Sequence, residues 1–147
     1  MGCGTRWIRE KDNDEMSDEL PLLNARDLRR LAGQAEAKAP CEACSELVCP
    51  GWESLPGAFD RSRLIRIGTL RQVSDEEPTV SEHHPAGTNA WSPDAPIAPA
   101  YFPYNRCDVW RCASCERVFL RYTEYGGYYE DERIRELNAG LIDDTSA

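Results

Sequence analysis

Two short cysteine motifs constrain this chain more than any other feature of its sequence. Each has the spacing Cys-x-x-Cys, one over Cys41–Cys44 and the other over Cys112–Cys115. Two such motifs supply four thiolates, which is the ligand set of a closed tetrahedral zinc site. We therefore expect Cys41, Cys44, Cys112 and Cys115 to bind one structural Zn²⁺ that joins the front and back of a single small domain.

Two further cysteines, Cys49 and Cys107, lie close to these motifs in sequence. The simplest interpretation is that they are small buried apolar residues. An alternative places them near each other across a sheet as a redox-active dithiol. The spacing of Cys107, Cys112 and Cys115 also matches a plant-type iron–sulfur motif, but no fourth cysteine follows, so zinc is the preferred metal.

Size and charge narrow the function classes. The chain has 147 residues, enough for one domain, and a formal net charge of −9, to which a four-thiolate zinc site would add about −2. Such a surface repels phosphate backbones and favours association with basic partners. No apolar stretch is long enough for a transmembrane helix or a signal peptide, so we expect a cytoplasmic protein with reduced thiols.

The residue pattern predicts an α+β fold with a small antiparallel sheet. Residues 24–38 have helical periodicity, with Asn24 as the N-cap. Branched residues predict a strand over 64–73 with a bulge at Gly68. The other expected elements are strands at 108–112 and 116–124, a short C-terminal helix at 129–137, and a long proline-rich loop at 74–105. The expected domain boundaries are an acidic flexible leader at 1–20, a single zinc-stapled domain at 21–142 and a tail at 143–147.

The second cysteine motif lies in a turn between two predicted strands. Within the second strand, Val118, Leu120 and Tyr122 alternate with Phe119, Arg121 and Thr123. A strand, a Cys-x-x-Cys turn and a second strand form a zinc knuckle, and the chain resembles zinc-ribbon proteins in this respect. The resemblance covers about a quarter of the chain and implies a bound metal without specifying a function.

The sequence has no catalytic signature. It contains no nucleophile elbow, P-loop, dinucleotide fingerprint or metalloprotease motif. Adjacent histidines such as His83 and His84 point in different directions, so we interpret them as solvated loop residues. We therefore expect a protein that is not an enzyme.

Tyrosines around a Gly-Gly turn form the best candidate for a recognition surface. Aromatic residues beside acidic ones are typical of protein-binding patches. The candidate residues are Tyr122, Tyr125, Tyr128, Tyr129, Glu130 and Asp131.

These observations favour a non-catalytic, zinc-stabilised module that binds a basic protein partner. A specific version is an immunity or inhibitor protein for a basic toxin or nuclease. One alternative is a nucleic-acid-associated zinc ribbon that uses Arg61, Arg63, Arg66 and Arg71. A second alternative is a thiol-redox or metal enzyme that uses Cys49, Cys107 or the histidine pair.

Overall fold

The computed structural model describes most of the chain from Leu20 onwards. The described residues are 20–36, 41–42, 44–47, 49, 51–72, 79–89, 91–125 and 128–145. The predicted acidic leader lies outside them except for Leu20. Among the described residues, no helix has the length and apolarity needed to cross a bilayer.

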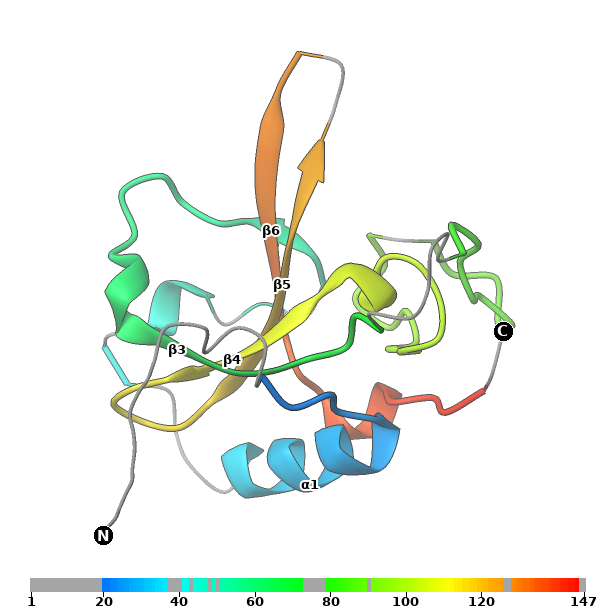
Figure 1. The fold of residues 1–147 in the computed structure, drawn as a ribbon, viewed down its shortest axis with the longest axis horizontal. Coiled ribbons are helices and arrows are strands. Elements are labelled where there is room, and N and C mark those ends of the chain that lie inside the picture. The colour runs from blue at the N-terminus through cyan, green and yellow to red at the C-terminus, as the bar shows by residue number, and fades with distance from the viewer. Residues whose placement is uncertain are drawn as a thin grey trace, which may run out of the picture.

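A five-stranded antiparallel sheet forms the centre of the fold, with the strand order β2-β6-β5-β4-β3 (Figure 1). Its strands are β2 (Glu53–Ser54), β3 (Leu64–Thr69), β4 (Asp108–Cys112), β5 (Val118–Tyr125) and β6 (Glu130–Glu136). Together with one α-helix, this sheet confirms the predicted α+β class. The strands at 108–112 and 116–124 are close to their predicted bounds, whereas β3 ends earlier than predicted.

The helix α1 (Ala25–Glu36) covers one face of the sheet. Its N-terminus is capped reciprocally, because the Asn24 side chain accepts from the Asp27 amide at 2.9 Å and the Asp27 carboxylate accepts from the Asn24 amide at 3.1 Å. Leu28 and Ala32 are fully buried from this side, in a core that includes Val109 and Leu120. The predicted N-cap is therefore confirmed.

A second, smaller core lies on the opposite face of the sheet. Phe119 and Ile134 project into it from the strands, and Leu47, Leu55 and Phe59 cover them from the segment before β3. The alternation along β5 explains the two cores, since Val118 and Leu120 face one side and Phe119 faces the other. The helix α1 thus covers one face of the sheet, and the segment before β3 covers the other.

The predicted C-terminal helix at 129–137 is wrong, because this segment forms β6. Seven consecutive residue pairs join it to β5, from Phe119↔Glu136 to Tyr125↔Glu130. Diagonal neighbours across the two strands then carry opposite charges, as in the ion pair between Arg133 and Glu124 at 3.2 Å. Cross-strand pairing of this kind outweighs the modest helix preference of a charged segment.

Gly68 lies at a bulge in β3, as its sequence context predicted. The register of β3 against β4 shifts between Arg66 and Gly68. A Cβ atom at Gly68 would lie 2.5 Å from the Leu23 side chain and 3.2 Å from the Pro21 carbonyl oxygen. Only glycine therefore allows the segment before α1 to pair with Thr69, whose amide and carbonyl bond to Pro21 and Leu23.

The described part of the proline-rich loop packs against the sheet. Ile97, Ala98 and Tyr104 are buried, and Ile97 pairs in parallel with Ile142 near the C-terminus. The fully buried Arg135 of β6 ties the loop down by donating to the Ala95 carbonyl at 2.9 Å. The same guanidinium donates to the Pro93 carbonyl at 3.3 Å and to the Tyr104 hydroxyl.

Candidate metal centre and hairpin surface

The four cysteines of the two motifs meet at one point. Their sulfur atoms all lie within 4.8 Å of one another, with separations of 3.6 Å for Cys41–Cys112 and 3.4 Å for Cys44–Cys115. A tetrahedral ion with metal–sulfur bonds of about 2.3 Å requires sulfur–sulfur edges of about 3.8 Å. The cluster therefore fits one metal ion with four thiolate ligands, as the sequence predicted.

Local backbone geometry positions the second pair of cysteines. The Glu116 amide donates to the Cys112 carbonyl at 3.0 Å, and Glu116 itself has a φ of 67°, in the left-handed region. Backbone amides of Ser114 and Cys115 bond to the Cys112 sulfur, and the Arg117 amide bonds to the Cys115 sulfur. Such bonds to sulfur orient metal ligands and favour their thiolate forms. The sequence pattern alone gave no reason to single out Glu116.

The environment of the thiols differs from one cysteine to the next. Burial raises the pKa of Cys44, and its hydrogen bond with Cys115 adds to the increase. Burial also opposes ionisation of Cys115, but backbone hydrogen bonds from Arg117 and Cys41 outweigh it and lower its pKa to about 7. A dication within the cluster would favour all four thiolates over thiols.

Cys49 and Cys107 do not join the cluster. Cys49 is buried and its sulfur lies 3.2 Å from the Leu47 carbonyl oxygen, while the fully buried Cys107 contacts the Pro103 carbonyl oxygen at 3.4 Å. Both are unpaired thiols. Burial raises the pKa of Cys49 to about 11 and that of Cys107 well above its ordinary value. Their surroundings agree with the interpretation of small buried residues, and neither takes the place of a ligand in the four-cysteine cluster.

The two adjacent histidines have different partners. His83 bonds to Asp143 at 2.9 Å and stacks on Tyr101, with ring centroids 4.8 Å apart. His84 instead contacts Glu82 and Thr88, each at 2.7 Å. The described residues therefore offer no arrangement in which both imidazoles share a metal ion.

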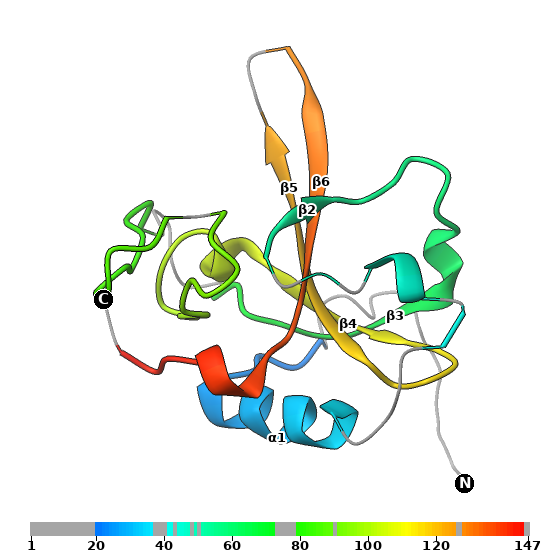
Figure 2. The same cartoon turned by 180° about the vertical axis from the view of Figure 1, so that it is seen from behind.

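The β5–β6 hairpin projects beyond the rest of the sheet (Figures 1 and 2). Near its tip Tyr125, Tyr128 and Tyr129 are exposed to 73%, 104% and 54%. Tyr122 differs from them, since it is half-buried and packs edge-on against Trp52 with ring centroids 5.0 Å apart. The predicted recognition residues are thus brought together on one hairpin, but Tyr122 belongs to its packed base.

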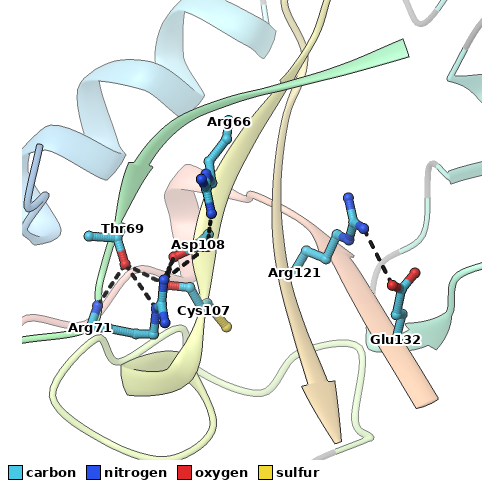
Figure 3. Close-up of polar contacts among 7 residues, drawn as sticks. All are labelled: Arg66, Thr69, Arg71, Cys107, Asp108, Arg121 and Glu132. Atoms are coloured by element: carbon cyan, nitrogen blue, oxygen red, sulfur yellow. Dashed lines mark hydrogen bonds and ion pairs between the residues drawn. The ribbon is translucent and has the colours of Figure 1, made fainter. Parts of the chain in front are cut away.

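A network of arginines spans β3 to β6 (Figure 3), on the face of the sheet that also carries Phe119 and Cys112. Asp108 is shared by Arg66 at 3.2 Å and Arg71 at 3.0 Å. Arg121 points the other way, toward Glu132 at 3.5 Å, and its guanidinium lies 4.4 Å from the centre of the Trp110 ring. Arg66 and Arg71 were expected above only as candidate nucleic-acid contacts. The two-residue alternation in β4 and β5 could have placed Asp108, Trp110 and Arg121 on one face beside them.

Comparison with known proteins provides no further guide to the function. No protein-family model, curated protein or solved structure matches this chain.

Proposed function

We propose that the four-cysteine cluster binds one Zn²⁺ and that this ion is structural. The chain supplies four ligands, so a tetrahedral ion has no open position for water or substrate. Cys44 and Cys112 are buried and come from segments far apart in sequence, as expected for a metal ion that stabilises the fold. The metal then holds Cys41 and Cys44 against the turn between β4 and β5.

Metal analysis of the purified protein tests the zinc assignment. We expect a colourless protein with about one zinc per chain, and cobalt exchange should give the intense visible absorption of tetrahedral thiolate coordination. The matched control is Cys107→Ser, which removes a buried thiol outside the cluster. A brown protein that contains iron, or zinc retained in full by Cys112→Ser, would refute the assignment.

We further propose that the domain is a non-catalytic protein-binding module whose partner contacts the β5–β6 hairpin. The observation that carries this proposal is the exposure of Tyr125, Tyr128 and Tyr129 on a projecting element. Exposed tyrosines supply a large contact area at a low entropic cost, and they are common among interface residues that contribute most of the affinity.

The charge of this surface favours a basic partner. Residues 122–133 contain Glu124, Glu130, Asp131 and Glu132 against the single Arg133. The chain as a whole carries a net charge of −9, which speeds encounter with a positively charged protein. An immunity or inhibitor protein for a basic toxin or nuclease is the specific form of this proposal.

Affinity capture from the cells that produce the protein tests the role of the hairpin. Two baits are compared, the wild-type protein and a variant with Tyr125→Ser, Tyr128→Ser and Tyr129→Ser. We expect a basic protein to be recovered by the first and lost at least tenfold from the second, at equal zinc content and melting temperature. Recovery of the same proteins by both baits would contradict the proposal. For the toxin form, co-expression with a basic toxin encoded next to this gene should restore growth.

The two alternative functions have weaker support. Of the arginines suggested for nucleic-acid binding, Arg61 is paired with Glu132, and Arg66 and Arg71 are both paired with Asp108. A salt-dependent mobility shift with RNA or DNA would revive that alternative. An activity lost in Cys49→Ser without loss of the fold would favour the redox alternative.

A further inference from the structure

The strand β5 is longer than its neighbour β4. The two strands are paired only from Arg111↔Val118 to Asp108↔Arg121. Beyond Arg121, residues 122–125 are paired with β6 alone. Residues 122–125 of β5 therefore have no neighbouring strand on the side where β4 pairs with the first half of β5.

The hydrogen bonding of β6 shows which groups lie on this edge. The Leu55 amide donates to the Glu132 carbonyl at 2.7 Å, so the main chain of Glu132 faces β2. Main-chain groups alternate along a strand, and Arg133 therefore faces β5, where its partner is Tyr122. The amide and carbonyl groups of the next residue, Thr123, consequently point away from β6, as do those of Tyr125. Among the described residues, no backbone partner is found for these groups.

A groove of about 550 Å³ runs beside this edge. It is bounded on one side by β5 and on the other by the end of the proline-rich loop and the start of β4. The lining residues used below are Phe102, Arg106, Asp108, Trp110, Arg121 and Thr123. The groove is large enough to hold a few side chains of a bound peptide, and its walls combine aromatic rings with guanidinium groups.

The fixed charges around the groove favour an acidic ligand group. Asp108 is shared by two arginines, and the Glu132 carboxylate is shared by Arg61 at 2.6 Å and Arg121 at 3.5 Å. The groove lining contains the arginines Arg71, Arg106 and Arg121 and two carboxylates, Asp108 and Glu124, so its cations outnumber its anions. A lining with an excess of guanidinium groups favours a ligand carboxylate.

We propose that an extended segment of the protein partner adds to the sheet beside Thr123 and Tyr125 and places an acidic side chain in this groove. The inference rests on the proposed protein-binding function. Main-chain hydrogen bonds to Thr123 and Tyr125 give the segment its alignment, and the arginines select the acidic residue. The open edge spans about 13 Å, so the segment is short. The acidic side chain is a local requirement, and a partner that is basic overall can contribute it.

A library of random heptapeptides displayed on phage is the probe for this site. Panned on the zinc-loaded protein, it should enrich peptides that contain Glu or Asp between β-branched or aromatic residues. Thr123→Pro removes one outward-facing amide without breaking a bond to β6, and we expect it to weaken binding of the enriched peptides about tenfold. Glu130→Pro is the matched control, because its amide faces the opposite edge of the hairpin, and it should leave the affinity unchanged. Replacing the acidic residue of the peptide by Gln or Asn should also weaken binding about tenfold.

Hydrogen exchange provides a measurement that needs no variant. Saturation of the wild-type protein with an enriched peptide should slow exchange of the Thr123 and Tyr125 amides. Failure to enrich peptides, equal binding by Thr123→Pro, or unchanged exchange at Thr123 would overturn the inference. If the captured partner depends on the tyrosines but not on Thr123, the groove inference fails and the proposed function stands. If no partner is captured while peptides bind the groove, the proposed function fails instead.

Discussion

The buried guanidinium of Arg135 allows a quantitative test of how the proline-rich loop is held. Arg135 is fully buried on β6 and donates to the Tyr104 hydroxyl and to the carbonyls of Pro93 and Ala95. In Arg135→Met the side chain keeps a similar volume but cannot donate. The buried Tyr104 hydroxyl and Ala95 carbonyl and the partly buried Pro93 carbonyl then lose a donor. The loss costs about 1–3 kcal/mol for each buried oxygen and less for Pro93. The change also removes the cost of burying a cation, which is several kcal/mol.

The balance of these opposing effects gives the expected magnitude. We expect Arg135→Met to lower the free energy of unfolding by about 2–4 kcal/mol, or the melting temperature by about 10 °C. The fold should survive, since domains of this size are stable by about 5–15 kcal/mol. Urea denaturation of the zinc-loaded protein, followed by tryptophan fluorescence, measures the change. The exposed Arg26→Met on α1 is the matched control and should alter stability by less than about 0.5 kcal/mol.

A local measurement separates this explanation from a general loss of stability. Amide exchange around residues 95–104 should accelerate in Arg135→Met more than exchange in β4 and β5, because the guanidinium contacts the loop directly. An unfolding free energy equal to that of the wild type, or acceleration spread evenly over the sheet, would refute the reasoning.

Three other perturbations have expected outcomes. Cys112→Ser should abolish cooperative unfolding, because binding of a structural zinc contributes about 10–16 kcal/mol to the free energy of folding. The control Cys107→Ser should still fold. Calorimetry of both variants at the same zinc concentration measures the difference. Glu116→Val should lower the free energy of unfolding by about 1–2 kcal/mol, because a β-branched residue disfavours the left-handed conformation that Glu116 adopts. Glu116→Gly should not lower it. Denaturation curves compare the two variants, and equal losses of stability would contradict the conformational explanation. Partial burial raises the pKa of Glu132, but contacts with Arg61 and Arg121 outweigh it and lower the pKa overall. Its stabilising effect is therefore present above the unfolded pKa of about 4.3 and is lost as the pH falls through the lower folded value. The stability difference between wild type and Glu132→Gln should shrink between pH 6 and pH 3, and a constant difference would argue against the pairing.

The parts of the fold that were predicted correctly depend on local signals. Cysteine spacing identified the four-sulfur cluster, Asn24 identified the start of α1, and the glycine in a run of branched residues identified the bulge at Gly68. In each case the determining interaction lies within a few residues or requires a specific side chain. The alternation in 118–123 likewise distinguished the two faces of β5.

The features that were missed depend on contacts between distant segments. The charged segment that forms β6 has a helix-like start, and the buried position of Arg135 conceals the alternation of a strand. The Gly126-Gly127 pair in the sequence between these two segments is typical of a hairpin turn and favours a strand on either side. The groove is less accessible still to sequence reasoning, because it exists only where the end of the loop, the start of β4 and the unpaired part of β5 meet.

The strand β5 connects the cysteine cluster to the exposed hairpin tip. The strand begins at Val118, just after the cysteine turn, and ends at Tyr125 beside the hairpin tip, about 24 Å away. A strand that slips by one residue exchanges the side chains on its two faces. Burial of Val118 and Leu120 on one face and of Phe119 on the other fixes this alignment, and a metal ion bound at the cysteine turn would reinforce it. Without the metal we expect the domain not to fold cooperatively, so the exposed tyrosines at the hairpin tip would lose their fixed positions. Capture of the proposed partner would then depend on the supply of zinc.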